Sequence, residues 1–260
     1  MEHLVQQAVT TIRERFWEPL SLDDLAQSAM VSKYHFLRVF SRVTGVTPGR
    51  FLSAVRLQEA KRLLLSTSLN VADVSARVGY SSTGSFTRRF TESVGFSPTQ
   101  YRKLALQVPG GTREPALPEA APSTVPAAPG AGSVTGALRT AGTALSPVYV
   151  GAFEGPILQG TPASWNNASA PGSFTLARVP AGTWYIHAVA RGRHPAGAAE
   201  TAGTAGGAGA EFTSLMATAG PVRVESGAAH LLDITLSPPD WSRPPILSAL
   251  TGIGPQPVAA

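Results

Sequence analysis

A residue pattern that occurs twice between Leu22 and Tyr101 constrains this chain more than any other feature. Positions 50 apart hold the same or a closely related residue: Phe36 and Phe86, Arg38 and Arg88, Phe40 and Phe90, Gly45 and Gly95, Pro48 and Pro98, Phe51 and Tyr101. An internal repeat indicates more than local propensity does, because chance rarely keeps register over so many positions. Each copy is typical of a helix, a tight turn and a second helix. The sequence therefore predicts two helix-turn-helix units.

Capping residues and prolines predict the helix boundaries in this segment. An apolar stripe precedes Pro19 and predicts a first helix that this proline ends. Ser21 and Asn70 are suited to begin the first helix of each copy, because their side-chain oxygens accept hydrogen bonds from unpaired backbone amides. Pro48 and Pro98 each follow a Thr or Ser and are typical of the first turn of a helix. The helix that starts at Pro48 is expected to connect the two copies.

Basic charge is concentrated in the repeated segment. Residues 1–104 contain 14 Lys and Arg against 8 Asp and Glu, a net charge of +6. Residues 105–260 contain 7 against 8, a net charge of −1, and the two values give the +5 of the whole chain. A basic module next to a neutral one is typical of a protein that binds a polyanion such as DNA.

The second helix of each copy is the expected DNA-reading element, because this helix of a helix-turn-helix enters the major groove. We expect its phenylalanines to anchor it and its opposite face to point outward. Arg38 and Arg88 are the strongest candidates, since a guanidinium can pair with O6 and N7 of guanine. The candidate base-reading residues are Tyr34, Leu37 and Arg38 in the first copy and Thr83, Gly84, Thr87 and Arg88 in the second.

A further set of residues is expected to contact phosphates, which supply affinity without sequence information. Two of them are the serines that cap the second helices, and the others are basic residues of the repeated segment. The set is Ser32, Arg42, Arg50, Arg56, Lys61, Arg62, Ser82 and Arg89.

The remainder of the chain changes character twice. Residues 107–131 are rich in proline and alanine and predict an extended linker. Residues 132–237 alternate apolar and polar positions in short runs, with a mobile loop expected between Gly192 and Ala210 and an irregular tail over 238–260. A hairpin from Phe174 to Ile186, turning at Pro180-Ala181-Gly182, is the clearest pair of strands. The strand candidates are Ser133–Arg139, Val148–Phe153, Ser173–Arg178, Thr183–Ala190, Pro221–Glu225 and Leu231–Leu236.

The repeated segment resembles the DNA-binding domain of the AraC/XylS family. The resemblance lies in the run from Ala72 to Ser82, in Ser85-Phe-Thr-Arg-Arg-Phe and in Val94-Gly-Phe-Ser-Pro-Thr-Gln-Tyr-Arg. It implies an AraC-type double helix-turn-helix over residues 1–106, whose outward positions read two successive major-groove segments on one face of the DNA. It implies a sequence-specific transcription regulator. Met30 departs from the pattern, because glycine is frequent at this position of the first turn.

Residues 132–237 resemble a carboxypeptidase-regulatory-like, prealbumin-type β-sandwich through the segment from Gly172 to Tyr185. The expected fold is therefore a two-domain chain, with an all-α double helix-turn-helix followed by an all-β sandwich. Such sandwiches serve in packing, assembly or ligand contact, and Trp165, Trp184 and Tyr185 are candidates for holding a ligand. A DNA-tethered module in which the sandwich senses an effector or dimerises remains the alternative.

Other classes of protein are not favoured by the sequence. The chain has no cysteine, which excludes disulfides, thiolate zinc sites and cysteine nucleophiles. His187, His194 and His230 are expected to be scattered residues, so neither an enzyme nor a cofactor is predicted. No secretory signal or membrane span is apparent, and a cytoplasmic location follows as the expectation. Double-stranded DNA is the expected partner, while contact with RNA polymerase, a small-molecule effector and homodimerisation stay open.

Overall fold

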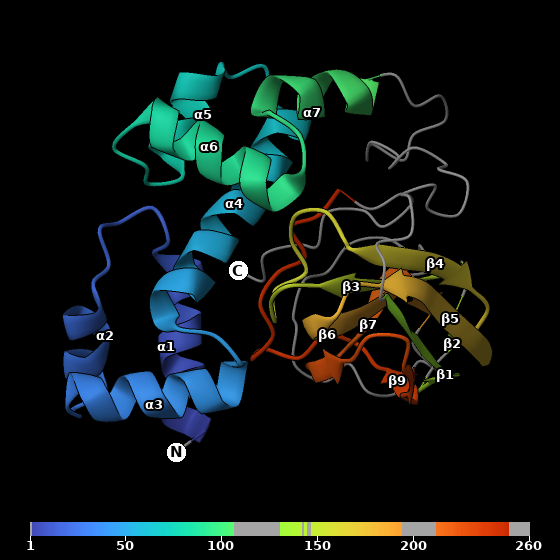
Figure 1. The fold of residues 1–260 in the computed structure, drawn as a ribbon. Helices are drawn as coiled ribbons and strands as arrows, with labels where there is room; N and C mark the ends of the chain where they lie inside the picture. The colour runs from blue at the N-terminus through green and yellow to red at the C-terminus, as the bar shows by residue number, and fades with distance from the viewer. Residues whose placement is uncertain (1, 107–130, 142, 145–146, 194–211, 250–260) are drawn as a thin grey trace. The chain divides into compact units, whose positions relative to one another are not determined.

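The computed structural model describes residues 2–106, 131–141, 143–144, 147–193 and 212–249 (Figure 1). Nearly all of the expected linker, most of the loop expected between Gly192 and Ala210, and the end of the tail lie outside the described residues. The described part divides into a helical unit and a β unit. The helical N-terminal region and the β-rich C-terminal region expected from the sequence are confirmed, while the domain boundaries stay predictions.

Side-chain caps define most helices of the helical unit. The side chains of Ser21, Ser32, Thr47, Asn70 and Ser82 each accept a hydrogen bond from the backbone amide three residues further on. These contacts confirm the capping residues expected from the sequence. The helices are α1 (Glu2–Glu14), α2 (Leu22–Ser28), α3 (Lys33–Thr44), α4 (Pro48–Ser66), α5 (Val71–Arg77), α6 (Thr83–Val94) and α7 (Pro98–Leu106).

Helix α4 connects the two helix-turn-helix units and contributes to a core that continues through both of them. Phe51 at its start and Leu64 near its end are both fully buried. The apolar stripe of α1, including Val5 and Ile12, closes the core next to the first unit. Burial of these side chains provides the main favourable free energy for the helical unit, at roughly 25 cal/mol per Å² of apolar surface.

The helical unit also contains two short segments from much later in the sequence. These are Pro156–Thr161, from the connection between strands β3 (Val148–Phe153) and β4 (Ser164–Ala168), and residues 240–249, which follow the last strand. Ile157, Leu247 and Ala249 are buried in the same apolar cluster as the helices. The sequence pattern does not predict this burial, because irregular segments have no periodicity that indicates it.

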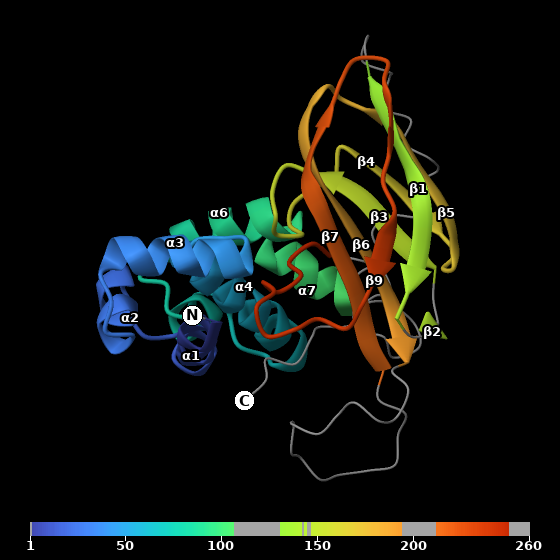
Figure 2. The ribbon, with the colours of Figure 1, turned by 90° about the horizontal axis from the view of Figure 1, so that it is seen from below.

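The β unit consists of two sheets in the described residues (Figure 2). One sheet has the order β5-β1-β8, with β9 also on β1, and the other has the order β2-β6-β3-β4, with β7 on β6. Val134 and Leu176 from the first sheet share an apolar cluster with Val150 and Ile186 from the second. The remaining strands are β1 (Gly132–Thr140), β2 (Thr143–Ala144), β5 (Gly172–Val179), β6 (Gly182–Arg193), β7 (Phe212–Val224), β8 (Ala229–Leu231) and β9 (Ile234–Leu236).

The expected hairpin from Phe174 to Ile186 is wrong. Strand β5 pairs with β1, whereas β6 pairs with β2, β3 and β7. The turn at Pro180-Ala181-Gly182 therefore leads from one sheet to the other. Alternation of apolar and polar residues identifies each strand correctly, but it does not contain information about the partner strand.

Two further strand predictions need correction, and strand β4 was missed. The candidate Pro221–Glu225 is only the end of β7, which begins at Phe212. The candidate Leu231–Leu236 is two short strands, β8 and β9, which both pair in parallel with β1. Strand β4 was not predicted, since its sequence Ser-Trp-Asn-Asn-Ala lacks a clear apolar alternation.

The aromatic residues considered for ligand contact have partners within the β unit. Trp184 is half-buried against the apolar cluster, and its Nε1 donates a hydrogen bond to the carbonyl of Pro180 at 2.7 Å. Trp165 stacks on Tyr149 with ring centroids 5.7 Å apart, and burial raises the pKa of the Tyr149 phenol. These contacts favour a packing role for both tryptophans.

Candidate nucleic-acid interface

The first helix-turn-helix consists of α2 and α3, joined by a tight turn at Met30. Met30 has a φ of 53°, a left-handed conformation that suits glycine better than a residue with a Cβ atom. Its side chain is 91% exposed, so no packing contact offsets this strain. Helix α3 then begins at Ser32, whose Oγ accepts from the amide of His35, and ends at Gly45 in the left-handed region.

The second unit repeats this geometry with α5 and α6. Gly79 occupies the turn position of Met30 with a φ of 84°. Ser82 caps α6 through the amide of Ser85, and Gly95 ends the helix as Gly45 ends α3. The two reading helices, α3 and α6, follow one edge of the helical unit in Figure 2.

Aromatic anchors hold both reading helices in equivalent ways. Phe36, Phe40 and Phe51 form a row with ring centroids 5.6 and 5.7 Å apart. Phe86, Phe90 and Tyr101 form the matching row with the same two distances. All six rings are fully buried. The repeat in the sequence is therefore also a repeat in the packing, and it gives α3 and α6 equivalent outward faces.

Every residue predicted to read bases lies on the outward side of its helix. Tyr34 is 78% exposed, and Arg38 and Arg88 are exposed as well. Thr83 and Gly84 are exposed at the start of α6, while Leu37 and Thr87 are half-buried.

The Arg88 guanidinium has a partner that the sequence analysis missed. Its Nη1 lies 3.3 Å from Oε1 of Glu92, one turn further along α6. The first copy has Arg42 at the position of Glu92, so only the second reading helix has a carboxylate next to its outward arginine. The spacing of four residues between Arg88 and Glu92 is visible in the sequence and could have indicated this pair.

The residues predicted to contact phosphates fall into two groups. Arg42, Arg50 and Arg89 are exposed, and Ser32 and Ser82 cap the reading helices. Arg62 is also exposed, although its Nε donates to both carboxylate oxygens of Glu59 at 3.0 and 2.9 Å. This hydrogen bonding raises the pKa of Arg62. The second group contains Arg56 and Lys61, whose cations point inward.

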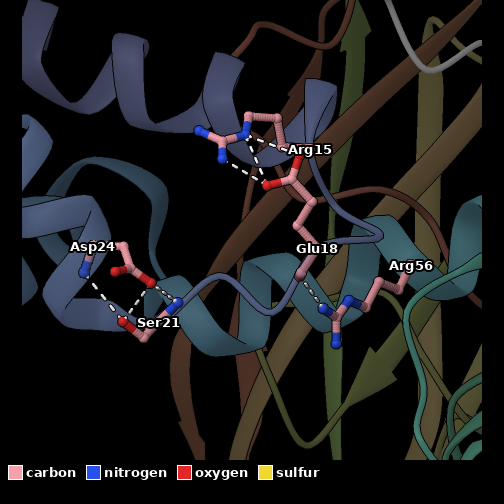
Figure 3. A network of polar contacts seen from close by, with 5 residues as sticks. All are labelled: Arg15, Glu18, Ser21, Asp24 and Arg56. Atoms are coloured by element: carbon pink, nitrogen blue, oxygen red, sulfur yellow. Dashed lines mark hydrogen bonds and ion pairs between the residues drawn. The ribbon is translucent and has the colours of Figure 1, made fainter.

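Polar contacts hold the loop between α1 and α2, where Arg56 binds (Figure 3). Arg15 donates to the carboxylate of Glu18 and lowers its pKa. Ser21 and Asp24 form a capping box, and the hydrogen bonds from Ser21 hold the pKa of Asp24 below its usual value. Arg56 reaches the same loop from α4, where Nε donates to the carbonyl of Phe16 and Nη2 to that of Glu18, both at 2.7 Å.

Arg56 and Lys61 were expected to contact phosphates, but both cations lie against backbone carbonyls of the helical unit. The guanidinium of Arg56 is used on two carbonyls, and burial lowers its pKa. Lys61 is only 1% exposed, and its Nζ lies 3.4 Å from the carbonyl of Ile246 and 5.9 Å from the centre of the Tyr101 ring. A contact of either cation with phosphate would require these bonds to break. The sequence could not show this, because the partners are backbone atoms distant in the chain.

Arg13 and Arg102 are two structural arginines that the sequence analysis did not single out. Arg102 of α7 donates from Nε to the carbonyl of Leu64 and from Nη2 to that of Leu69, at 3.0 and 2.6 Å. It holds the loop before α5 as Arg56 holds the loop before α2. Arg13 of α1 donates to the carbonyl of Trp241 at 3.2 Å, and burial lowers its pKa.

The histidines of the β region do not gather at one place in the described residues. His187 is buried, with Nδ1 3.0 Å from Oγ1 of Thr218 and Nε2 2.9 Å from the carbonyl of Gly155. Nε2 of His230 accepts from the amide of Glu225 at 3.4 Å, and His194 lies outside the described residues. Within the described ranges, no three His, Asp or Glu side chains form a cluster that could hold a metal. Among the helices described, none has the length and apolar character needed to cross a bilayer.

The duplicated geometry defines the class of protein. Residues 25–104 match the family model described as a helix-turn-helix domain. The chain is 33% identical over 99 residues to the HTH-type transcriptional activator AarP of Providencia stuartii. The match covers 38% of this chain and 73% of that protein. The chain therefore belongs to the AraC-type helix-turn-helix transcription regulators, and the expected DNA-binding domain is confirmed over residues 25–104.

Other relatives match over the same region. The chain is 42% identical over 82 residues to the HTH-type transcriptional regulator Rv1931c of Mycobacterium tuberculosis. This match covers 32% of each protein. It is 30% identical over 98 residues to the lactose operon transcription activator of Staphylococcus xylosus, which is 35% of that protein. The chain thus spans about a third of the length of these two relatives. Among solved structures, the DNA-binding domain of AdpA in complex with a target DNA is 30% identical, with 41% of this chain and 97% of that chain covered and a TM-score of 0.39.

Proposed function

We propose that this protein regulates transcription by reading a specific DNA sequence with α3 and α6 in two successive major-groove segments. The grooves on one face of B-DNA are about 34 Å apart, so a chain with two reading helices can cover an asymmetric site. In this proposal Arg38 and Arg88 contact bases. Tyr34, Leu37, Thr83, Gly84 and Thr87 line the same faces and complete the base-reading set.

The observation that supports the proposal best is the equivalence of the two reading helices. Arg38 and Arg88 are outward at repeat-equivalent positions, while the rings beside them are buried in matching rows. A lone exposed arginine is usually a solvated charge, but solvation alone gives no reason for the same residue at both positions. The basic excess of residues 1–104 supports binding to a polyanion.

We propose a phosphate-contacting set that is smaller than the sequence predicts. It contains the exposed arginines and the two serine caps, whose helix N-termini favour an anion. Arg56 and Lys61 are left out because their cations are bonded to carbonyls of the helical unit. The proposed set is Ser32, Arg42, Arg50, Arg62, Ser82 and Arg89.

Selection of duplexes from a random pool with the full chain tests the proposal. We expect enrichment of one site with two information-rich segments. Arg38→Ala should relax base preference in one segment and Arg88→Ala in the other, each by about 1–3 kcal/mol of discrimination. Arg89→Ala is the control, which should weaken all sequences alike and lower the salt dependence. Recovery of an unenriched pool at physiological salt would overturn the proposal.

We propose that the β unit is a sandwich of the carboxypeptidase-regulatory-like kind and that it has no catalytic role. The apolar cluster shared by the two sheets supports the arrangement, and the names of the relatives support regulation over catalysis. Sensing of an effector, homodimerisation and contact with RNA polymerase in the cytoplasm stay predictions. Sedimentation of the full chain tests self-association, and a single monomeric species at micromolar concentration would exclude a stable homodimer.

A further inference from the structure

Residues 240–249, which we name the strap, bind the helical unit at several separate places. At its start, the carbonyls of Trp241 and Arg243 accept hydrogen bonds from Nη2 of Arg13 in α1, at 3.2 and 3.5 Å. In its middle, the carbonyl of Ile246 lies 3.4 Å from Nζ of the buried Lys61 in α4. Two buried or half-buried cations are therefore directed at the strap backbone.

The end of the strap binds the C-terminal end of α6. The amide of Ala249 donates to the carbonyl of Val94 at 3.3 Å. The segment Pro156–Thr161 lies against the same place, because the amide of Gly160 donates to the carbonyl of Ser93 at 2.6 Å. The strap and this segment are also joined, since the amide of Leu247 donates to the carbonyl of Leu158 at 2.9 Å.

Apolar burial accompanies these hydrogen bonds. Leu247 and Ala249 are each 1% exposed and belong to the core cluster of the helical unit, and Trp241 packs against that cluster. These side chains are shielded from water by the helices, so the strap is part of the apolar core of the helical unit.

The strap gives the two helix-turn-helix units a second connection in addition to α4. Helix α1 packs against α3, and Val94 is the last residue of α6. The strap thus accepts hydrogen bonds from Arg13, on the neighbour of one reading helix, and donates one to Val94, at the end of the other. We propose that the strap is a positioning element that fixes the angle between α3 and α6, and so sets the spacing of the DNA segments that the protein accepts. This inference depends on the proposed function.

The strap leaves the DNA-facing residues of α6 uncovered, which distinguishes positioning from inhibition. On α6 its hydrogen bond is to the carbonyl of Val94 at the end of the helix, whereas Thr83, Gly84 and Arg88 are exposed. Val94 lies 11 residues after Thr83, which corresponds to about 16 Å along a helix. DNA could therefore bind while the strap stays docked.

Leu247→Asp in the full chain tests the inference, because a carboxylate cannot stay buried in this apolar cluster. Leu231→Asp is the matched control, since Leu231 in β8 is 83% exposed. The probes are the duplex selected by the unmodified chain, the same duplex with two base pairs inserted between its segments, and a duplex with one segment only. Hydrogen exchange at the amides of Leu247 and Ala249 reports whether the strap has undocked.

We expect the unmodified chain and Leu231→Asp to lose about tenfold or more in affinity on the insertion, because a rigid pair of helices cannot adapt. Leu247→Asp should lose less than about threefold on the insertion, and should bind the selected duplex about tenfold more weakly because preorganisation is lost. Its affinity for the one-segment duplex should not change. Leu247→Ala, a smaller change, should give the same pattern to a lesser degree.

Two results would overturn the inference. One is an unchanged spacing preference in a variant whose strap amides exchange freely. The other is equal weakening on all three duplexes with loss of helical circular dichroism in both Leu247 variants, which would mean that the strap only stabilises the fold. Failure of the proposed function is a different result, in which the unmodified chain selects no sequence at all.

Discussion

Glu92→Gln should strengthen DNA binding. In the free protein the Glu92 carboxylate is 3.3 Å from the guanidinium of Arg88, and both side chains are largely exposed, at 54% and 67%. In the proposed mode of binding, Arg88 exchanges this partner for a base edge when DNA binds. Glutamine keeps the shape of the side chain and removes its charge, so the helix is not expected to change.

The size of the effect follows from two contributions. An exposed ion pair of this kind stabilises the free protein by about 0.2–1 kcal/mol. The unmodified chain loses this free energy when DNA binds, whereas the variant has no ion pair to lose. A unit charge about 8 Å from a phosphate in water adds roughly 0.5 kcal/mol of repulsion, which the variant removes. The sum is about 1 kcal/mol, or about fivefold in the dissociation constant, at low salt.

Fluorescence anisotropy with the selected duplex measures this change. The gain should shrink between about 0.1 and 1 M salt, since the Debye length falls from about 10 to 3 Å. Glu14→Gln is the control, because it makes the same charge change on α1, outside both reading helices. In an Arg88→Ala background the contribution of the ion pair should be absent. Only the contribution from repulsion between Glu92 and phosphate should then be left. Equal or weaker binding by Glu92→Gln at low salt would refute the reasoning.

Three further predictions concern backbone geometry. Met30→Gly should stabilise the helical unit by about 0.5–1 kcal/mol in chemical denaturation, because relief of the left-handed strain exceeds the added chain entropy; a loss of stability would contradict the strain at this turn. Gly79→Ala should destabilise it by about 2 kcal/mol or more, since φ is 84° and a Cβ would lie 2.6 Å from the carbonyl oxygen of Trp17; an unchanged denaturation midpoint would contradict this contact. Gly136→Ala should destabilise the β unit by about 3 kcal/mol or more, because a Cβ there would lie 1.8 Å from the carbonyl oxygen of Leu232; thermal unfolding that matches the unmodified chain would exclude this close approach.

The helical unit was predicted well because its signals are local. A serine or asparagine cap, a proline in the first turn and a glycine after the last turn each determine backbone geometry within a few residues. Because the pattern occurs twice, each copy supports the helix boundaries predicted for the other. Met30 shows the strength of this argument, since it adopts the left-handed conformation of its counterpart Gly79 despite having a Cβ atom.

The strand partners and the inward cations could not be predicted in the same way. Strands β5 and β6 are adjacent in sequence but belong to different sheets, which depends on the packing of the whole β unit. In the sequence Lys61 resembles any other basic residue of α4, whereas in the structure its Nζ lies 3.4 Å from the carbonyl of Ile246, 185 positions away. Long-range contacts of this kind have no periodicity in the sequence.

Contacts of residues 240–249 with the helices have a practical consequence for anyone who shortens the gene. A stop codon after Pro239 would leave both helix-turn-helix motifs intact on paper, yet it would remove Leu247 and Ala249 and uncover the ammonium group of Lys61. A truncated chain that ends near residue 106 would lack the same contacts. Genetic screens should therefore recover late nonsense alleles with impaired DNA binding, although every side chain proposed to contact DNA is still encoded.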